Sequence, residues 1–571
     1  MTEPPTAGLE KSQPSPSARI GWGLLIIATL YVCYFSHLGA IGFVGPDEPR
    51  YAWIARAMAE TGDWVTPRLY GQPWFEKPPL YYWGAAISFK VSGVSEAAAR
   101  LPSAISALLA TLALAWLAWR MYGAETARWL LLLLPTTVGM IGFSHAAATD
   151  MPFSGMLTIA MVYAAVVLRL IPAAEGGAIP APTSLSTPWS ALVLFGLFLG
   201  LAVLAKGPAG IILCGGAVFF WGIFTKRWRD AFRLLHPAAV AAFCLTALPW
   251  YILCARRNHD FFRVFIIEHN FKRYLTPEFQ HIQPFWFYGP VFLLAILPWS
   301  ILFLWTAVPS IAPAARSRTL SADILFFGSW IIFCVAFFSA SQSKLPGYIL
   351  PAIPPVGLIL SRGYLALAGK RRTLFGAVSL TIGLGIFVVA ELAGAARIHA
   401  VRDSAPVLFA VLRVLLILAM PNILLGLTFL VSKHRLFQNA CLIVAVIGLV
   451  GPLFPADGIL NDLEPIYFGQ KDFALQLITH RVPLERTFFY LGVSRSTRYA
   501  LNFYLHREIP DWNQSARLDA YVIDGSMDCR RLRKKGFECE QVPLGGAEER
   551  WSVSHVTPRT SVGPARSRQP Q

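Results

Sequence analysis

A chain of 571 residues with 55% hydrophobic and 14% charged residues is too apolar for an ordinary soluble domain and belongs to the membrane class. Its formal net charge of +17 does not indicate nucleic-acid binding, because the basic residues cluster in short connections between apolar runs. No Gly-rich nucleotide fingerprint follows a predicted strand and no Walker lysine motif is present, which argues against a nucleotide-sugar donor or ATP coupling.

The chain begins with a Pro/Ser-rich tail, residues 1–19, and we interpret the apolar segment after it as a retained anchor without a small-residue cleavage site. About 20 apolar residues span a bilayer as a helix, and we count about thirteen such runs. They are Ile20–Val44, Leu101–Arg120, Ala127–Ser144, Met151–Leu168, Trp189–Ala205, Ala209–Phe224, Pro237–Cys254, Pro284–Thr306, Ile324–Ala340, Tyr348–Leu367, Leu374–Leu392, Val407–Leu430 and Phe437–Phe454.

The connections between these runs alternate in charge as the positive-inside rule requires for a cytoplasmic N-terminus. Six alternate connections contain lysines or arginines that fit this rule: Arg120 and Arg128; Arg169; Lys226, Arg227, Arg229 and Arg233; Arg316 and Arg318; Lys370, Arg371 and Arg372; Lys433 and Arg435. Counting Pro78–Val91 as a further span breaks this agreement, so we predict a surface-lying helix there.

The opposite connections face outward in this topology and contain unusual charged residues. They are the loop after the first span, the His145–Asp150 junction, Lys206, the segment Asn258–Gln283 and the segment Ser341–Tyr348. Charges beside hydrocarbon cost roughly 2.5–3.5 kcal/mol each, so they usually face a water-filled cavity and mark function. A single lysine can instead snorkel to the interface, but five loops with such groups predict one shared cavity.

After Phe454 the pattern changes to short strand-like runs (Thr487–Leu491, Ala520–Ile523, Ser552–Val556) between helix-like segments (Lys471–Arg481, Arg498–Arg507). This alternation predicts a small α/β domain, placed outside by the odd number of spans. Cys529 and Cys539 lie in it, and both a disulfide and a reduced pair are compatible with the sequence. The other six cysteines lie in apolar runs as packing residues.

The sequence Asp47-Glu48-Pro49-Arg50-Tyr51 follows the first span almost directly, which places its carboxylates near the membrane surface. Asp47 can act as a general base toward an acceptor oxygen or orient it through hydrogen bonds. It can equally start a surface helix as its N-cap, and the residues alone leave both interpretations open.

A second acidic and basic pair lies in Phe75-Glu76-Lys77-Pro78-Pro79. In an extended segment Glu76 and Lys77 point in opposite directions, so we do not expect them to pair with each other. Lys77 suits a phosphate, whereas Glu76 with His269 can bind a divalent metal or make structural hydrogen bonds. Further candidates for phosphate contacts are Arg50, Lys206, Arg273 and Lys344, and Asp150 is a second buried-looking acid.

Several of these motifs, in order along the chain from about Asp47 to Pro355, resemble one enzyme family. They are DEPRYA, TGDWVTPRLYGQPWFEKPPLYYW, ATDMP, GLAVLAKGP, EHNFKRY, FWFYGPVFLLAILPWS and SKLPGYILPAIPP. The chain is similar to the bacterial GT-C superfamily glycosyltransferases of the aminoarabinose (lipid A) transferase-like group, which are related to protein O-mannosyltransferases.

The resemblance implies a polytopic α-helical membrane protein of GT-C type with about thirteen transmembrane helices and a small C-terminal extracytoplasmic α/β domain. It implies a polyprenyl-phosphate-linked sugar as donor and a lipid or glycan acceptor, without nucleotide or nucleic acid. The implied site residues are Asp47 and Asp150 as catalytic acids; Arg50, Lys77, Lys206, Arg273 and Lys344 at the donor phosphate; Tyr51, Trp74, Tyr81 and Tyr348 lining the cavity; and Glu76 and His269 for a metal, zinc or another divalent ion.

We therefore expect an inverting glycosyltransferase of the bacterial inner membrane with its active site facing the periplasm. The expected parts are a cytoplasmic tail (1–19), a transmembrane glycosyltransferase domain (20–456) whose first extracytoplasmic loop (45–100) is catalytic, a periplasmic α/β domain (457–557) and a disordered tail (558–571). The alternatives are a protein O-glycosyltransferase of the same superfamily and a lipid-sugar transporter or flippase. A flippase calls for broken helices near the membrane midplane and related halves. A receptor or assembly scaffold is a third alternative.

Overall fold

A computed structural model describes residues 15–171, 188–275, 282–306, 320–397, 405–451, 469–490, 492–513, 519–524, 529–534, 536–544 and 551–558. Arg316, Arg318, the first 14 residues and the predicted C-terminal tail from residue 559 lie outside these ranges. The chain divides into two compact units. The membrane unit comprises 1–38, 75–81 and 100–456, and the second unit comprises 39–74, 82–99 and 457–571.

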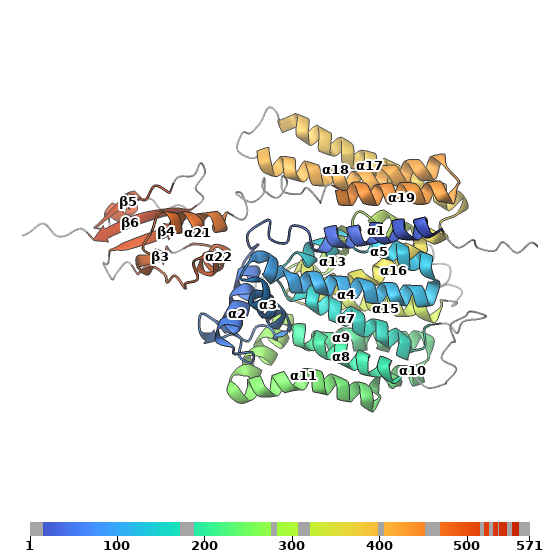
Figure 1. The fold of residues 1–571 in the computed structure, drawn as a ribbon, viewed down its shortest axis with the longest axis horizontal. Helices are drawn as coiled ribbons and strands as arrows, with labels where there is room; N and C mark the ends of the chain where they lie inside the picture. Colours follow the sequence, from blue (N-terminus) through green and yellow to red (C-terminus); the bar gives the residue numbers. More distant parts are fainter. Residues whose placement is uncertain are drawn as a thin grey trace, which may run out of the picture. The chain divides into compact units, whose positions relative to one another are not determined.

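Within the described part of the chain, nine helices of the membrane unit are long and apolar enough to cross a bilayer (Figure 1). They are α1 (Pro16–Tyr34), α4 (Glu96–Tyr122), α7 (Asp150–Val167), α8 (Trp189–Lys206), α11 (Pro237–Arg257), α15 (Ala322–Ala340), η5 with α16 (Pro346–Ala352 and Ile353–Ala366), α17 (Gly369–Arg397) and α18 (Ala405–Val431).

Two bent helix pairs and two shorter apolar helices occupy the remaining predicted spans. In the first bent pair, α5 (Ala124–Leu133) is followed by α6 (Val138–Ser144). In the second, the segment Phe285–Ala295 is followed by Ser300–Thr306. The segment Phe285–Ala295 comprises η4 (Phe285–Phe287) and α13 (Tyr288–Ala295). The shorter helices are α9 (Ala209–Thr225) and α19 (Arg435–Val450). The predicted set of about thirteen runs is therefore helical, and the chain is a multi-pass membrane protein.

The first predicted span, Ile20–Val44, is wrong at its C-terminal end. Helix α1 ends at Tyr34, and the apolar residues that follow form turns. Phe43 packs in the second unit, where its ring centroid lies 4.8 Å from that of Phe503. Hydrophobicity alone does not distinguish a residue in contact with lipid from one buried in a protein core, so the sequence pattern placed this boundary too late.

Close helix packing in the membrane unit depends on small residues. A Cβ on Gly155 of α7 would lie 2.8 Å from the carbonyl oxygen of Ser106 on α4. Likewise, a Cβ on Gly357 of α16 would lie 2.8 Å from Leu134 Cβ. Small residues at helix interfaces allow the backbones to approach closely in membranes. The result is a continuous buried core, with α17, α18 and α19 packed side by side at one edge (Figure 1).

The second unit combines the first loop with the C-terminal domain. The first loop forms α2 (Asp47–Thr61), the two short strands β1 (Arg68–Leu69) and β2 (Gln72–Pro73), and most of α3 (Leu80–Ser92). Tyr70 and Gly71 between the strands both have positive φ, as a two-residue type I′ hairpin requires. Helix α3 confirms the helix predicted at Pro78–Val91, and its 13 residues are too few to span a bilayer.

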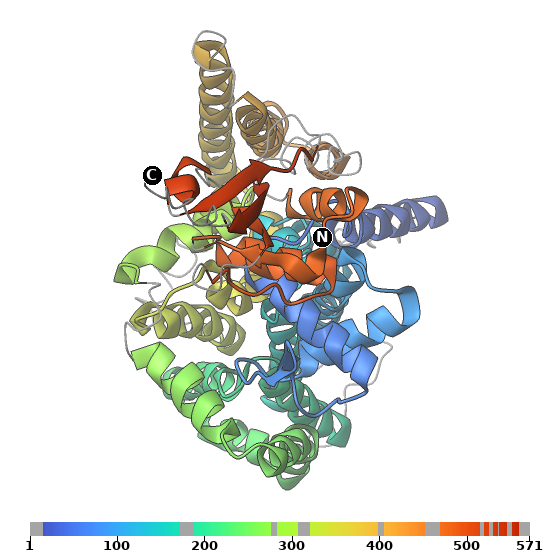
Figure 2. The ribbon, with the colours of Figure 1, turned by 90° about the vertical axis from the view of Figure 1, so that its left-hand side faces the viewer.

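The C-terminal part of this unit is a four-stranded sheet in the order β3-β4-β6-β5 with helices (Figure 2). The strands are β3 (Thr487–Phe489), β4 (Ala520–Asp524), β5 (Phe537–Gln541) and β6 (Ser552–Pro558), and only β3 and β4 are parallel. Helices α21 (Gln470–Thr479) and α22 (Arg495–Leu505) pack on one face and α23 (Cys529–Lys534) on the other. The predicted α/β fold is confirmed, and β5 is a strand that the sequence analysis missed.

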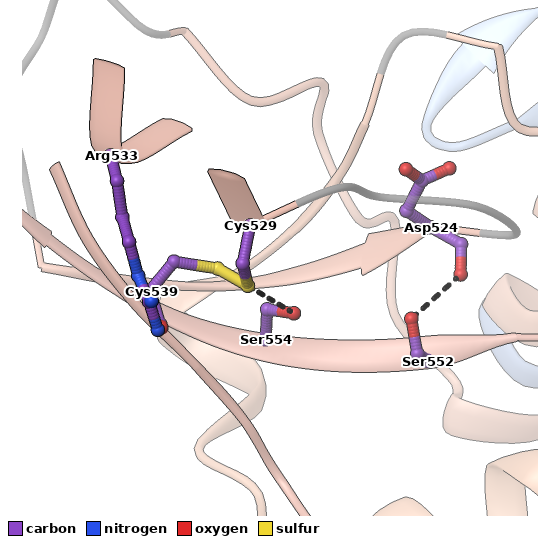
Figure 3. The surroundings of a disulfide bond; sticks show 6 residues. All are labelled: Asp524, Cys529, Arg533, Cys539, Ser552 and Ser554. Atoms are coloured by element: carbon purple, nitrogen blue, oxygen red, sulfur yellow. Dashed lines mark hydrogen bonds between the residues drawn. A yellow bond between two sulfur atoms is a disulfide. The ribbon is translucent and has the colours of Figure 1, made fainter. Parts of the chain in front are cut away.

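A disulfide joins Cys529 of α23 to Cys539 of β5, with the two Cα atoms 5.5 Å apart (Figure 3). Cys529 Sγ lies 3.9 Å from Ser554 Oγ on β6. Of the two alternatives that the sequence left open, the structure contains the disulfide. The bond ties the helix on this face to the edge strand beside it.

Candidate active site

Asp150 and Lys206 form an ion pair in the membrane unit, at the ends of two neighbouring helices. Asp150 is the first residue of α7 and Lys206 the last of α8, and Lys206 Nζ donates to Asp150 Oδ1 at 2.5 Å. Their side chains are 20% and 10% exposed, so solvent screens the pair weakly. Lys206 Nζ also lies 4.6 Å from the centroid of the Tyr348 ring. Three separately predicted loops therefore meet here, and together they hold a fixed cation.

Gly347, next to Tyr348 in η5, is required for this close approach. A Cβ at this position would lie 2.8 Å from Phe143 Cε1 and 2.9 Å from Asp150 Oδ1. Real Cβ atoms essentially never come so close, so a larger residue must displace Asp150 or Phe143. The sequence analysis quoted the SKLPGY motif but did not identify this glycine.

We expect Gly347→Ala to lower turnover about 10- to 100-fold, because moving Asp150 misplaces Lys206. Overpacking also costs about 1–3 kcal/mol of stability. The measurement is turnover per folded protein, beside the apparent melting temperature. Gly328→Ala in α15 is the matched control, since a Cβ added at Gly328 would have no heavy atom of the described residues within 4 Å. Equal turnover in both variants contradicts the role of Gly347.

Lys344 precedes this segment and is buried, and its Nζ donates to the carbonyl oxygen of Ser341 at 2.6 Å. The backbone N–H of Gln342 donates to the carbonyl oxygen of Tyr274 at 3.0 Å, which joins this loop to the segment containing EHNFKRY. Arg273 lies in the short helix α12 (Arg273–Leu275), and its side chain is outside the described residues. Lys344 and Arg273 as phosphate ligands stay predictions.

Glu76 and Lys77 lie close together, which corrects the expectation that they point apart. Lys77 Nζ is 3.6 Å from Glu76 Oε1, and both side chains are largely buried. The expectation assumed strand geometry, but β2 ends at Pro73 and the chain bends through these residues, so side chains do not alternate. The neighbouring Phe75 ring lies 5.3 Å from that of Phe261, which joins this part of the first loop to the segment after α11.

The metal prediction rests on Glu76 and on His269, which is half-buried in the π-helix η2 (Arg263–Lys272). Within the residues that the structure describes, no three His, Cys, Asp or Glu side chains are grouped to bind a metal. A catalytic zinc site uses three protein ligands, and here the Glu76 carboxylate has an ammonium group beside it. The metal at Glu76 and His269 therefore stays a prediction, and we assign no reaction step to it.

In the second unit, Asp47 and Arg50 form the other charged cluster. Asp47 is the first residue of α2, so it begins a helix as one interpretation of the sequence proposed, although Pro46 is the N-cap. Arg50 Nη2 donates to Asp47 Oδ1 at 2.5 Å. The Arg50 side chain is 5% exposed and that of Asp47 is 50% exposed. Asp47 is therefore accessible to a ligand, whereas the buried Arg50 fixes the position of its carboxylate.

Three aromatic rings surround the Arg50 guanidinium. Its Cζ lies 5.1 Å from the ring centroid of Tyr51, 5.6 Å from that of Trp74 and 5.7 Å from that of Tyr499. Cation–π contacts of this kind stabilise a desolvated arginine. Tyr499 belongs to α22, so the C-terminal domain contributes to this cluster, a role that the sequence analysis missed.

Tyr70 connects Tyr499 to the rest of the loop. Its ring stacks on that of Tyr499 with centroids 6.4 Å apart, and its hydroxyl accepts a hydrogen bond from Asn502 Nδ2 at 2.9 Å. Burial raises the pKa of the Tyr70 phenol, so it stays neutral at physiological pH and accepts this bond without charge. These contacts hold α22 against α2 within the unit.

We expect Tyr499→Ala to lower kcat/KM about 3- to 30-fold, because one cation–π contact contributes about 0.5–2 kcal/mol to holding Arg50. Tyr499→Phe keeps the aromatic face and is expected to stay within twofold of the wild type. Steady-state activity assays on both variants make the comparison. A loss of the same size in Tyr499→Phe would assign the effect to the hydroxyl and contradict the role of the ring.

The four residues predicted to line the cavity occupy different environments. Tyr51 and Tyr81 are buried. Trp74 and Tyr348 are half-buried and lie beside Arg50 and Lys206 respectively. Trp74 and Tyr348 are thus adjacent to the charged clusters, and the cavity-lining role of all four stays a prediction.

Known proteins with similar structures support the fold. The chain superposes on ArnT from Cupriavidus metallidurans, in a crystal structure bound to undecaprenyl phosphate, with a TM-score of 0.73, 24% identity and coverage of 95% of this chain and 99% of that one. The apo structure of the same protein gives 0.74 at 23% identity, covering 96% and 100%. These likenesses show that the chain has the fold of that protein.

Sequence comparison agrees. The family described as dolichyl-phosphate-mannose-protein mannosyltransferase matches residues 22–265. Proteins named undecaprenyl phosphate-alpha-4-amino-4-deoxy-L-arabinose arabinosyl transferase are 32% identical over 380 residues in Pseudomonas aeruginosa (strain UCBPP-PA14), covering 66% of each chain, and 33% identical over 368 residues in Sodalis glossinidius, covering 64% of each. The match thus spans slightly less than two thirds of these relatives. The chain is thus similar to the aminoarabinose transferases and, over residues 22–265, to the protein mannosyltransferase family.

Proposed function

We propose that this protein is an inverting glycosyltransferase that moves a sugar from undecaprenyl phosphate to lipid A or another envelope lipid or glycan. The single observation that carries the proposal is the Lys206–Asp150 pair beside Tyr348, where three loops of the membrane unit meet. A transporter does not need a fixed cation at the ends of these helices, whereas a lipid phosphate that becomes a leaving group does. The relatives' names supply the first donor to test, 4-amino-4-deoxy-L-arabinose on undecaprenyl phosphate.

The reaction is a direct displacement at the anomeric carbon of the donor sugar. An acceptor oxygen forms the new bond to that carbon while the bond to the phosphate oxygen breaks, and undecaprenyl phosphate leaves with the electron pair. Lys206 and Lys77 are the cations that stabilise the negative charge developing on the phosphate. The electrostatic attraction between a preorganised cation and the phosphate is stronger in a water-poor site than in bulk water.

Asp47 is the residue we assign to the acceptor, because its carboxylate is half-exposed while Arg50 holds one of its oxygens. With a hydroxyl acceptor, Asp47 takes the proton as the new bond forms. With a phosphate acceptor the attacking oxygen is already anionic, so Asp47 only orients it. Arg50 acts through Asp47 as a positioning residue in this scheme.

The orientation in the membrane follows from the charges of the connections. Six connections on the side opposite Asp150, Lys206 and Tyr348 carry lysines and arginines, which by the positive-inside rule supports a position of these three residues at the periplasmic face of the inner membrane. Undecaprenyl-linked sugars presented on that face are the donors that this orientation suits.

The test is transfer by the purified full-length protein in liposomes, with undecaprenyl phosphate-linked aminoarabinose as donor and lipid A as acceptor. Mass spectrometry is expected to show the acceptor gaining one sugar and free undecaprenyl phosphate accumulating. Transfer only to a protein acceptor would reassign the acceptor class. Movement of intact donor between leaflets without loss of its sugar would establish a flippase and overturn the proposal.

A further inference from the structure

An apolar groove lies in the membrane unit between α8, α9 and α11, with a volume of about 430 Å³. Helix α8 forms its floor, because α8 packs against both α11 and α9. The α8–α11 contact is tight: a Cβ on Gly196 would lie 2.1 Å from the carbonyl oxygen of Ala239. Several wall residues, including Ile211, Phe219 and Val240, are exposed large hydrophobic side chains, so the groove opens sideways toward lipid.

The short helix α10 (Trp228–Phe232) and η1 (Arg233–Leu235) close one end of the groove. Trp228, Phe232 and Leu235 from this segment line the groove. The connection that contains the segment is also basic: four cations, Lys226, Arg227, Arg229 and Arg233, accompany the single acid Asp230. The groove therefore has an apolar body and a strongly positive end.

Asp230 neutralises only part of this charge. Arg227 Nε donates to Asp230 Oδ2 at 2.8 Å, and Arg233 Nη1 lies 2.9 Å from Asp230 Oδ1. Lys226 and Arg229 are exposed, and in the described ranges no ion pair involves either side chain. These two exposed cations thus lie within two residues of Trp228, which lines the groove.

We propose that this groove binds an anionic phospholipid, with an acyl chain along α8 and the phosphate at Lys226 and Arg229. The positive-inside rule places this end at the cytoplasmic leaflet. There, each basic residue near the surface enriches anionic lipid about fivefold, and basic pockets between transmembrane helices bind such headgroups. An acyl chain gains little by leaving the bilayer for the groove, so the two cations determine the selectivity. This site does not depend on the proposed transferase activity.

The experiment is native mass spectrometry of the full-length protein in detergent, titrated separately with phosphatidylglycerol and phosphatidylethanolamine. We expect the protein to prefer phosphatidylglycerol at least fivefold. Lys226→Gln with Arg229→Gln is expected to weaken phosphatidylglycerol binding about 20-fold and to remove the preference. The matched control is Lys370→Gln with Lys433→Gln, two exposed lysines of other basic connections, which is expected to leave binding unchanged.

Gly215→Phe tests the groove without changing its charge. Gly215 lines the groove, and among the described residues a Cβ there meets no heavy atom within 4 Å, so the ring fills the space without a clash at its root. It is expected to lower phosphatidylglycerol binding at least fivefold while the protein keeps its melting temperature. Equal binding of the two lipids by the wild type, or wild-type binding by either groove variant, overturns the proposal. Displacement of phosphatidylglycerol by an equimolar amount of undecaprenyl phosphate also overturns it and assigns the groove to the donor lipid.

Discussion

Replacing Lys206 by methionine is expected to lower turnover at least 100-fold and to destabilise the protein. The turnover loss follows because removing one preorganised donor to a developing negative charge costs about 10²–10³ in rate. The stability loss follows because Asp150, whose side chain is 20% exposed, loses its contact with the Lys206 ammonium group. Breaking a buried ion pair by removing one partner costs about 3–5 kcal/mol. Transfer assays and thermal unfolding in detergent measure the two effects separately.

A double variant separates catalysis from structure at this pair. Lys206→Met with Asp150→Asn leaves no uncompensated charge, so most of the lost stability is expected to return while turnover stays low. Arg362→Met is the matched control, because it breaks the pair between Arg362 and Asp323 (3.1 Å) elsewhere in the same unit. It is expected to lower stability but to keep turnover per folded protein. Recovery of turnover in the double variant would make the Lys206–Asp150 pair purely structural.

The sequence was sufficient to predict the helices of the membrane unit and the chemistry of its loops, because both depend on local patterns. Apolar runs of about 20 residues need a helix to satisfy their backbone in lipid, and charged residues at their ends are rare enough to notice. Asp150 and Lys206 were both selected in this way, one as an acid and the other as a phosphate ligand. That they bond to each other did not follow, since 56 residues separate them.

Contacts over long separations account for most of what the sequence did not reveal. Tyr499 follows Arg50 by more than 400 residues, and no periodicity connects an aromatic residue of a C-terminal helix with an arginine of the first loop. The role of Gly347 also could not be predicted from the sequence, because it depends on how near Asp150 lies in the fold. The error at Glu76 and Lys77 has another cause: a rule for regular strands was applied to a bend. The missed strand β5 has alternating exposed glutamates, which weakened its apolar signal.

Asp47→Asn is expected to lower turnover about 100-fold or more with a hydroxyl acceptor, since general base catalysis contributes about 10²–10⁴. The amide keeps the size of the side chain but cannot take a proton. Stability is expected to change little, because the Asp47 side chain is 50% exposed and three aromatic rings still stabilise the buried Arg50 guanidinium. Glu60→Gln is the matched control: it lies in the same helix α2, is 46% exposed, and pairs with Arg56 at 2.7 Å. Glu60→Gln is expected to retain wild-type turnover.

The size of the loss in Asp47→Asn also reports the chemistry of the acceptor. A phosphate acceptor needs orientation but no base, so its transfer falls less than transfer to a hydroxyl in the same variant. Donor binding, measured with labelled undecaprenyl phosphate-linked sugar, is expected to stay within threefold of the wild type, whereas Lys206→Met weakens it. This difference separates a residue that serves the acceptor from one that serves the leaving phosphate. Turnover of Asp47→Asn within threefold of Glu60→Gln for both acceptors would remove Asp47 from the mechanism.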